Sequence, residues 1–448
     1  MASNVIGEQA VVIGGGMGGL AAAGALANHF EKVVVLERDF LPPNVSERPG
    51  TPQCRHIHAL LAGGQRALRE LFPEFEHDLA RAGAVPLRVA TDLRLEVPGF
   101  DPFPQRDLGW HVYSMSRPLI ELVVRQQVQR YANVTLRERC RVRNLIVSPD
   151  RETVAGVRCE DGDGRSETLP VDLVVDASGR GSLTQDLLVS IGYPSPEETV
   201  IGVDFGYARA IFAIPDDAPA DWKGAMTLPN ASENSRGALM LPIEGQRWMV
   251  GFAGRYGEKP PGDFEGFLAF AQQMRTSTVY NAIRRAQPLS NVARYGFAAS
   301  IWRHFEKLEA FPRRLLPFGD AICRFNPVWG QGMSVAAQEA VLLRRVLGSG
   351  DGNPLTTLAR SFFAEASELI ETPWVSAAIP DFAFPRTEGE RPADLDRMLN
   401  FGNALTRLAA DDPAVHKLTV EVRHLLKPRS ALRDPDLVGR VEDIMAEM

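Results

Sequence analysis

Three glycines near the N-terminus have the spacing of a phosphate-binding turn. Gly14, Gly16 and Gly19 follow the apolar run 11–13 and precede a run with helical character, residues 20–29. The first glycine allows a tight turn, the second lets a pyrophosphate approach the backbone, and the third lets helix and strand pack closely. A second apolar run leads to Glu37, 18 residues after Gly19, where a carboxylate can accept hydrogen bonds from a ribose diol. The pattern predicts a dinucleotide site.

Two later stretches combine an apolar strand with a polar turn. The strand 171–176 ends in Asp176, and the strand 315–321, which contains Asp320, is followed by Pro327, Gly330 and a predicted helix over 334–347. Strands of one parallel sheet bind ligands at their carboxyl ends, so both turns are expected near the first one. Free N–H groups at the start of the last helix and in residues 330–333 would stabilise negative charge on an electron-rich ring.

Several arginines are candidates for phosphate or ribityl contacts. Arg48 and Arg55 lie in a proline-rich loop, residues 41–61, and guanidinium groups match phosphate geometry, but two solvated arginines are an equally open interpretation. Arg117 follows Ser116, a good N-cap, so it stands at a helix N-terminus, where the dipole disfavours a cation. This misfit favours either a ligand role or a salt bridge for Arg117.

Composition excludes several classes of function. The 448 residues carry a net charge of −7, so no nucleic-acid surface is indicated. The sequence has no apolar run of about 18 residues and no signal-peptide pattern at its N-terminus, so we expect a cytoplasmic protein without a transmembrane segment.

The four cysteines of the sequence are widely spaced and favour structural thiols. His56 and His58 share one face of an extended segment, but no further ligand is near, so packing or hydrogen bonding is favoured over zinc.

The elements that must position these residues form an α/β pattern. We expect a helix over 62–83, short strands over 84–113, and a helix from residue 116. Strands 134–136 and 142–147 with a hairpin turn at 161–164 predict an inserted meander. Alternation over 210–214, 237–242 and 247–253 predicts a second, antiparallel sheet. After residue 350 the chain is predicted to be mostly helical, with breaks at Pro373, Pro380, Pro385 and Pro428.

The three motifs occur in the order found in a known superfamily. Gly14 to Gly19 with Glu37, the Asp176-Ala-Ser-Gly-Arg stretch, and Gly319-Asp320 followed by Pro327 and Gly330-Gln-Gly-Met resemble the FAD-dependent monooxygenases with the fold of p-hydroxybenzoate hydroxylase and squalene epoxidase. The usual Asp-Gly of the middle motif is Asp-Ala here, a variant more typical of halogenases and prenyl reductases. Glu37-Arg38-Asp39, Arg55-His56-x-His58, Ser116-Arg117-Pro118 and Phe325-Asn326-Pro327 are most similar to the branch of polyether-forming polyene epoxidases.

The resemblance implies an FAD site and a role for each matching residue. Glu37 would bind the adenosine ribose, with Arg38 and the Val142 backbone at the adenine. Arg48 and Arg117 would face phosphate or ribityl oxygens, and Asp320 a ribityl hydroxyl. Gly332 and Met333 would donate N–H groups to the pyrimidine edge of the flavin. The remaining cofactor-binding candidates are Gly14, Gly16, Met17, Gly18, Gly19 and Asp176, and Pro327 and Gly330 form the expected loop at the flavin face.

The resemblance also implies a domain plan. We expect a Rossmann-like FAD-binding domain of the glutathione-reductase type over 1–85, 105–190 and 311–350. A mostly antiparallel β-sheet substrate domain is expected over 86–104 and 191–310, and a helical C-terminal region over 351–448.

The implied activity is a monooxygenase reaction. Reduced FAD and O2 would give a C4a-hydroperoxide that epoxidises or hydroxylates a largely apolar small molecule of secondary metabolism, with NAD(P)H or a partner flavin reductase as electron source. No catalytic acid–base residue is demanded. Aromatic and sulfur side chains on the sheet strands are candidates for the pocket wall, although core packing suits most of them better: Phe205, Phe212, Met240, Trp248 and Phe252.

Three rival classes remain open at this stage. A halogenase would carry a Trp-x-Trp-x-Ile-Pro motif and a reactive lysine, but the chain has no lysine between Lys32 and Lys223. A prenyl-type reductase would use the same flavin without oxygen. A flavin-free protein like the Rab escort and dissociation-inhibitor proteins would keep the nucleotide fold, but the intact Gly319-Asp320 motif argues against it.

Overall fold

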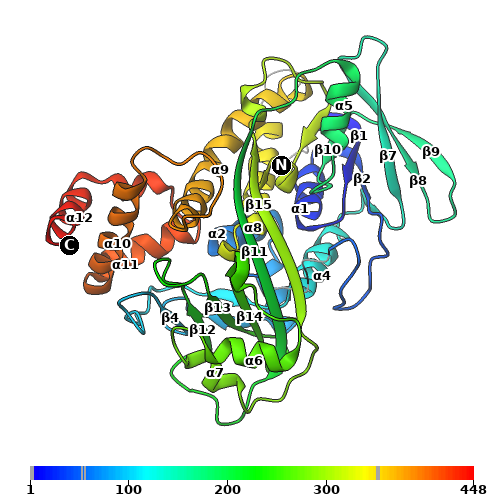
Figure 1. The fold of residues 1–448 in the computed structure, drawn as a ribbon. Helices are drawn as coiled ribbons and strands as arrows, with labels where there is room; N and C mark the ends of the chain where they lie inside the picture. The colour runs from blue at the N-terminus through cyan, green and yellow to red at the C-terminus, as the bar shows by residue number, and fades with distance from the viewer. Residues whose placement is uncertain (1–4, 52–53, 55–56, 350–353) are drawn as a thin grey trace.

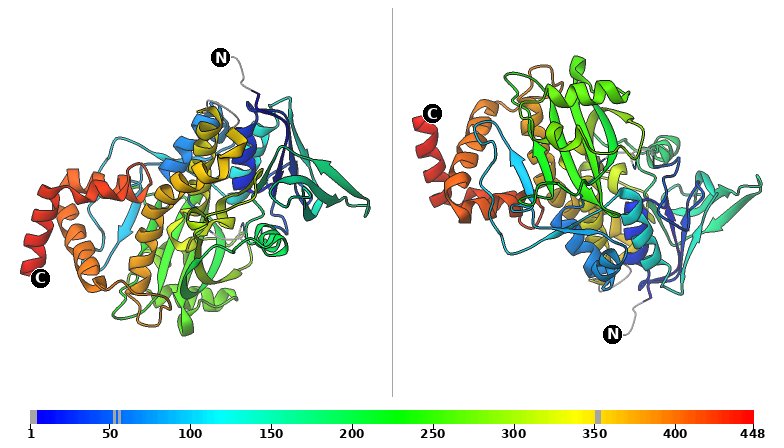
Figure 2. Two further views of the ribbon diagram at one scale, coloured as in Figure 1. Left: turned by 90° about the horizontal axis from the view of Figure 1, so that it is seen from above. Right: turned by 90° about the horizontal axis from the view of Figure 1, so that it is seen from below.

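A computed structural model describes residues 5–51, 54, 57–349 and 354–448 (Figure 1). A parallel sheet with its helices lies at one side, a long antiparallel sheet runs through the middle, and the C-terminal helices lie at the opposite side (Figures 1 and 2). This arrangement confirms the predicted α/β fold class with an antiparallel sheet and a helical C-terminal region. No helix in the described part of the chain combines the length and the apolar character needed to cross a lipid bilayer.

The parallel sheet is built from the apolar runs that the sequence predicts. Its five strands have the order β16-β10-β1-β2-β6, and all neighbours are parallel: β1 (Gly7–Ile13), β2 (Phe30–Leu36), β6 (Val134–Arg137), β10 (Leu173–Asp176) and β16 (Leu315–Pro317). The prediction that 134–136 belongs to the inserted meander is wrong, because β6 pairs with β2 at the sheet edge. The meander is the separate three-stranded sheet of β7 (Arg141–Val147), β8 (Val154–Glu160) and β9 (Ser166–Pro170).

Helices cover the parallel sheet and place their N-termini at its carboxyl edge. One core cluster joins the sheet to α1 (Met17–Leu26), α2 (Ala62–Leu71), α3 (Phe75–Arg81), α4 (Arg117–Val128) and α8 (Gly332–Gly348). The single helix predicted over 62–83 is wrong, since α2 and α3 are separate. Pro73 lies between them, and Phe72 before it is extended, as expected for a residue preceding proline. Helix α5 (Leu183–Ile191) follows β10.

The second sheet is antiparallel except at one edge. Its order is β17-β15-β11-β14-β13-β12-β4, with β4 (Leu93–Glu96), β11 (Glu198–Ala213), β12 (Gly224–Thr227), β13 (Gly237–Ile243), β14 (Arg247–Arg255), β15 (Ala293–Arg303) and β17 (Cys323–Arg324). Strands β12 and β4 run parallel. One face packs an aromatic core against α6 (Phe264–Gln272) and α7 (Thr278–Ile283), so the other face is free to line a pocket. Strands β3 (Val85–Leu87) and β5 (Val112–Ser114) form a small ribbon.

Four helices form the C-terminal region. They are α9 (Leu358–Phe382), α10 (Leu395–Asp411), α11 (Pro413–Arg423) and α12 (Pro435–Glu447). The predicted breaks at Pro373 and Pro380 are wrong, because α9 continues through both. Pro373 and Trp374 are buried, and this packing offsets the backbone hydrogen bonds that proline cannot make.

Candidate functional site

A cavity of about 2090 Å³ lies where the parallel sheet, the antiparallel sheet and the C-terminal helices meet. It brings most of the predicted site residues together, although they come from distant parts of the chain. Its lining includes Gly14, Gly16, Met17, Gly18, Glu37, Arg38, Arg48, Arg117, Val142, Asp320, Pro327, Gly330, Gly332 and Met333. Gly19 and Asp176 are not among the lining residues. Arg55 and His56 lie outside the described residues, whereas His58 lines the cavity.

In the first turn, Gly19 allows helix and strand to pack closely, and Gly16 leaves its backbone accessible to a ligand. Gly14 has a φ of +102°, and its N–H donates to the Leu36 carbonyl at 2.9 Å. A Cβ on Gly19 would lie 1.8 Å from the Gly14 carbonyl oxygen, so Gly19 serves the close approach of helix and strand. A Cβ on Gly16 would meet no atom within 4 Å. The backbone at Gly16, which is also the N-cap of α1, is therefore open to a ligand from the cavity.

Glu37 is held by backbone donors at this turn. Its carboxylate accepts hydrogen bonds from the N–H groups of Gly15 at 2.7 Å and Asp39 at 2.9 Å, and Arg48 Nη1 lies 3.1 Å away. A carboxylate offers about four acceptor positions, so Glu37 keeps acceptor capacity toward the cavity.

The two predicted arginines share a buried carboxylate that sequence reasoning missed. Arg48 Nε lies 2.6 Å from Glu121 Oε1, and Arg117 Nη1 lies 3.0 Å from Glu121 Oε2, in ion-pair contact without hydrogen-bond geometry. Burial alone would raise the pKa of Glu121, but Arg117 and Arg48 together lower it. Glu121 is one helical turn after Arg117, so the (i, i+4) spacing is the sequence signal that could have identified it.

Asp176 has a structural position in the middle motif. It is buried, and its carboxylate accepts hydrogen bonds from the backbone of Ser178 and Thr184 and from the Thr184 hydroxyl at 2.6 Å. Asp176 thus fixes the turn rather than lining the cavity. Ser178 is among the lining residues, and its buried hydroxyl has no hydrogen-bond partner among the described residues.

The last loop places an acid and two further arginines at the cavity. Asp320 follows β16 in the short helix η4 (Gly319–Ala321), and its side chain is accessible through the cavity although protein surrounds it. Burial raises the pKa of Asp320, and Arg324 and Arg180 oppose that shift. Both arginines line the cavity and were missed by sequence reasoning, although Arg180 ends the middle motif. Arg324 also lies over the Phe297 ring at 4.6 Å.

Helix α8 begins at this loop without a side-chain cap. Its N-cap is Gln331, and no side chain of the described residues caps the helix, so its first N–H groups are free for a ligand. Behind the loop, the buried Glu339 carboxylate accepts a hydrogen bond from the Gly319 N–H at 2.8 Å. Burial raises the pKa of Glu339 to about 8.

These observations fit FAD. The open backbone at Gly16 and the uncapped starts of α1 and α8 are donors for phosphates and for the carbonyl groups of a flavin. Several cavity-lining residues carry buried polar atoms without a hydrogen-bond partner among the described residues, and Ser178 Oγ, Trp329 Nε1 and Gln331 Oε1 are three of these atoms. Arg117, Arg180 and Arg324 add positive charge at the same wall, as a pyrophosphate requires.

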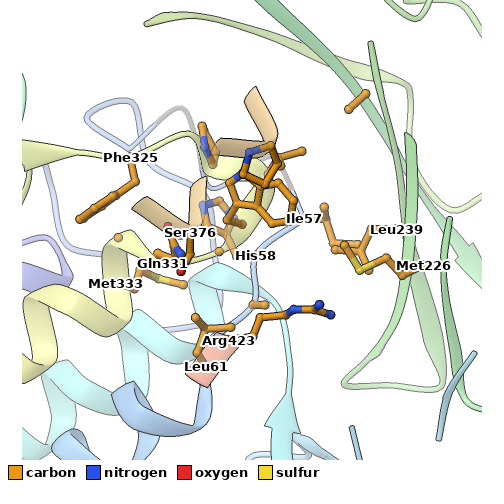
Figure 3. A pocket seen from close by; sticks show the side chains of 18 of the residues that line it. Ile57, His58, Leu61, Met226, Leu239, Phe325, Gln331, Met333, Ser376 and Arg423 are labelled. Carbon is orange, nitrogen blue, oxygen red and sulfur yellow. The ribbon is translucent and has the colours of Figure 1, made fainter. Parts of the chain in front are cut away.

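The rest of the cavity has an apolar wall. Figure 3 shows Phe325, Gln331 and Met333 of the last loop on one side, and Met226 and Leu239 of the antiparallel sheet on the other. Among the sheet candidates, Phe205 lines the cavity, whereas Phe252 borders it but packs its ring on Phe267 at 4.6 Å in the sheet–helix core. Three others are fully enclosed in the sheet–helix core instead: Phe212, Met240 and Trp248.

Sequence comparison connects the chain to known flavoproteins. Residues 8–350 match the family described as FAD binding domain. Protein Rv3254 of Mycobacterium tuberculosis is 34% identical over 396 residues, which cover 86% of this chain and 82% of that protein. Rifampicin monooxygenase of Streptomyces venezuelae is 30% identical over 194 residues, covering 43% of this chain and 36% of that protein.

Structure comparison shows the same fold in a flavin-dependent brominase. The flavin-dependent brominase Bmp2 superposes with a TM-score of 0.64 at 13% sequence identity, covering 98% of both chains. At this identity the likeness concerns the fold alone, so the reaction must be argued from the residues of this chain.

Proposed function

The chain belongs to the FAD binding domain family of the FAD-dependent monooxygenases, and on this premise we propose that it inserts one oxygen atom from O2 into a largely apolar small molecule, by epoxidation or hydroxylation. One observation carries the proposal. A single cavity joins the open turn at Gly16 and the uncapped start of α8 to the apolar face of the antiparallel sheet. Cofactor and substrate would therefore share one enclosed space.

The residues divide into those that hold FAD and those that hold the substrate. Gly16 and the first turn of α1 would bind the pyrophosphate, Glu37 the adenosine ribose, and Asp320 a ribityl hydroxyl. Gly332 and Met333, at the start of α8, would donate N–H groups to the flavin ring. The bound FAD supplies the activation of dioxygen.

The loop and the sheet would exclude water and orient the substrate. Pro327 and Trp329 form the short helix η5 (Pro327–Trp329) at the mouth between the FAD side and the sheet. Phe205 and Leu239 offer apolar surface across from it. Removing water from this space protects a reactive oxygen species from side reactions and favours reaction with an alkene or an activated ring.

Among the other flavin reactions, halogenation has weaker support. The chain has no lysine between Lys32 and Lys223, and Lys223, immediately before β12, pairs with Asp92 at 3.0 Å. Its similarity to a brominase rests on the fold. Reduction without oxygen uses the same cofactor site, and the experiment must separate it from oxygen insertion.

The test first measures reduction of the flavin and then measures incorporation of oxygen into the product. The flavin-loaded protein is mixed with NADH or NADPH without oxygen, or with a flavin reductase, and bleaching of the visible flavin band is recorded with and without candidate polyenes and aromatics. Oxygen is then admitted and products are analysed by mass spectrometry. We expect a product heavier by one oxygen atom that carries label from ¹⁸O2. Hydrogenated or halogenated products, or protein that cannot take up flavin, would contradict the proposal.

A further inference from the structure

Arg423 presents a positive charge to the cavity, where its side chain is accessible although protein surrounds it. It is the last residue of α11, it lines the cavity, and Figure 3 shows its side chain reaching into the pocket. No hydrogen bond or ion pair within the described residues uses its guanidinium group. Burial alone lowers the pKa of Arg423, and no carboxylate opposes this shift.

The backbone around Arg423 is anchored to the FAD side of the molecule. The next residue, His424, accepts the Gly63 N–H on its carbonyl at 2.8 Å, and its ring accepts the Ala62 N–H at 3.3 Å. The Leu425 carbonyl accepts from Gln338 Nε2 on α8 at 3.0 Å. Arg423 is therefore held at a fixed place relative to the helices that would bind FAD.

The surroundings of Arg423 are apolar. Leu426 and Trp110 pack in one cluster with Ile57 and Leu239, and the Trp110 ring lies 5.2 Å from the His424 ring. Burial, with Arg423 nearby, lowers the pKa of His424 to about 3, so this histidine is neutral at physiological pH. Arg423 thus supplies the local positive charge beside an apolar surface.

Arginines outnumber acidic side chains in the cavity lining. Among the described residues, twelve arginines line it with the acidic side chains of Glu37, Asp320 and Asp411, although Arg48, Arg209 and Arg255 are paired with carboxylates. The arginines near Asp320 fit the phosphates of FAD, but Arg423 reaches the cavity from the helical C-terminal region, next to the apolar sheet wall. The Arg423 guanidinium is exposed to the cavity and has no counterion among the described residues, and a carboxylate on a ligand could pair with it through two parallel hydrogen bonds.

We propose that Arg423 anchors the carboxylate of an amphipathic organic acid, whose apolar skeleton lies against Ile57 and Leu239. This inference rests on the proposed function in one respect only, that the acid is the substrate. It narrows the substrate class from apolar small molecules in general to apolar acids, and it makes Arg423 a specificity-determining residue.

The test uses two probes that differ only in charge. Titration calorimetry on the flavin-loaded protein compares 8-anilinonaphthalene-1-sulfonate with N-phenyl-1-naphthylamine, which has the same rings without the sulfonate. We expect saturable binding of both probes to the wild type. Arg423→Gln should weaken binding of the anion by about tenfold or more and leave the neutral probe unchanged, because a hydrogen-bonded charge pair contributes roughly 1.5–3 kcal/mol.

Two control variants make the result decisive. Arg423→Lys should restore part of the affinity for the anion, and Arg397→Gln, at an exposed arginine of α10 that pairs with Glu442, should change nothing. Equal weakening of both probes, equal affinity of the anion for wild type and Arg423→Gln, or no binding of the anion would each overturn the inference. Because the assay measures binding, its outcome is independent of whether oxygen is inserted.

A further experiment tests whether Arg423 binds a substrate carboxylate or the phosphate of a nucleotide. Binding of NADPH and NADH to the same proteins is compared, since only NADPH carries the 2′-phosphate. We expect Arg423→Gln to leave both affinities unchanged. A selective loss of NADPH binding would assign Arg423 to the phosphate and overturn the carboxylate proposal.

Discussion

Asn326 Nδ2 donates to both carboxylate oxygens of Asp381, at 3.0 and 3.1 Å, although the two residues are 55 positions apart. The Asn326 side-chain oxygen accepts from the Tyr207 hydroxyl at 3.0 Å and from the Val328 N–H at 3.2 Å. Asp381 also pairs with Arg255, and both side chains are almost fully buried. One amide therefore ties the loop at η5 to β11 and α9, and it sets the position of Pro327 and Trp329 at the cavity.

Asp381→Asn should destabilise the protein strongly. The variant removes the charge that compensates Arg255, and a buried arginine left unpaired costs about 3–5 kcal/mol, reduced by its contacts with the Phe205 and Phe384 rings at 4.1 and 4.2 Å. Urea unfolding followed by circular dichroism measures the loss. Tyr207→Phe is the matched control, and it should cost only about 1 kcal/mol because Asn326 keeps its bond from Val328. Equal losses in the two variants would disprove the argument.

Gly16 and Gly19 should respond to substitution in opposite ways. Gly16→Val places its side chain in the open cavity and has compatible backbone angles, φ −78° and ψ −177°, so the fold should survive with a loss of about 1 kcal/mol at the N-cap. The same side chain should block the pyrophosphate and abolish flavin retention. Thermal unfolding and the flavin-to-protein absorbance ratio give the two readouts. Retention of flavin by Gly16→Val would refute the assignment.

Gly19→Ala is the counterpart that tests packing rather than binding. Its Cβ would lie 1.8 Å from the Gly14 carbonyl oxygen, so the turn and α1 must separate. We expect insoluble or unfolded protein, detected by circular dichroism. A folded, colourless Gly19→Ala protein would show instead that this glycine, like Gly16, serves the ligand.

Sequence predicts those parts of the fold and site that depend on local spacing. The strands β1, β2, β10 and β16 and the turn with Gly14 follow from short apolar runs and glycine positions. The break between α2 and α3 is also local, because Pro73 favours an extended conformation for the residue before it, although the prediction of one helix over 62–83 did not use this signal. Pro373 does not break α9, because burial against the core outweighs the local preference.

The partners that orient the site side chains are not local. Glu121 is 73 residues from Arg48, and Asp381 is 55 residues from Asn326, so no periodicity in the sequence connects them. Arg423 reaches the cavity because the segment after α11 docks on α2 and α8. Such docking depends on complementary surfaces of complete helices, and therefore only the folded chain displays it.

Asp320→Ala should yield protein that purifies with little flavin. A hydrogen bond between a carboxylate and a ribityl hydroxyl contributes roughly 1.5–3 kcal/mol, so flavin affinity should fall by about tenfold to a hundredfold. Flavin content after dialysis measures this. Asp163→Ala is the control, because Asp163 is an exposed acid in the turn between β8 and β9. Full flavin content in Asp320→Ala would exclude a ribityl role for this residue.

Glu339→Gln should change how stability depends on pH. Burial raises the pKa of Glu339 from 4.5 to about 8, so the folded protein holds a proton that the unfolded chain releases. This contribution to stability is complete below pH 4.5 and is lost as the pH rises to about 8, at about 1.4 kcal/mol per pH unit. Glutamine is neutral at every pH and keeps an oxygen for the Gly319 N–H. In thermal unfolding between pH 5 and 8, the wild-type midpoint should therefore fall relative to that of Glu339→Gln. Parallel curves for the two proteins would mean that Glu339 is ionised in the folded state, and the carboxylate would then need a counter-charge that the described residues around Gly319 do not supply.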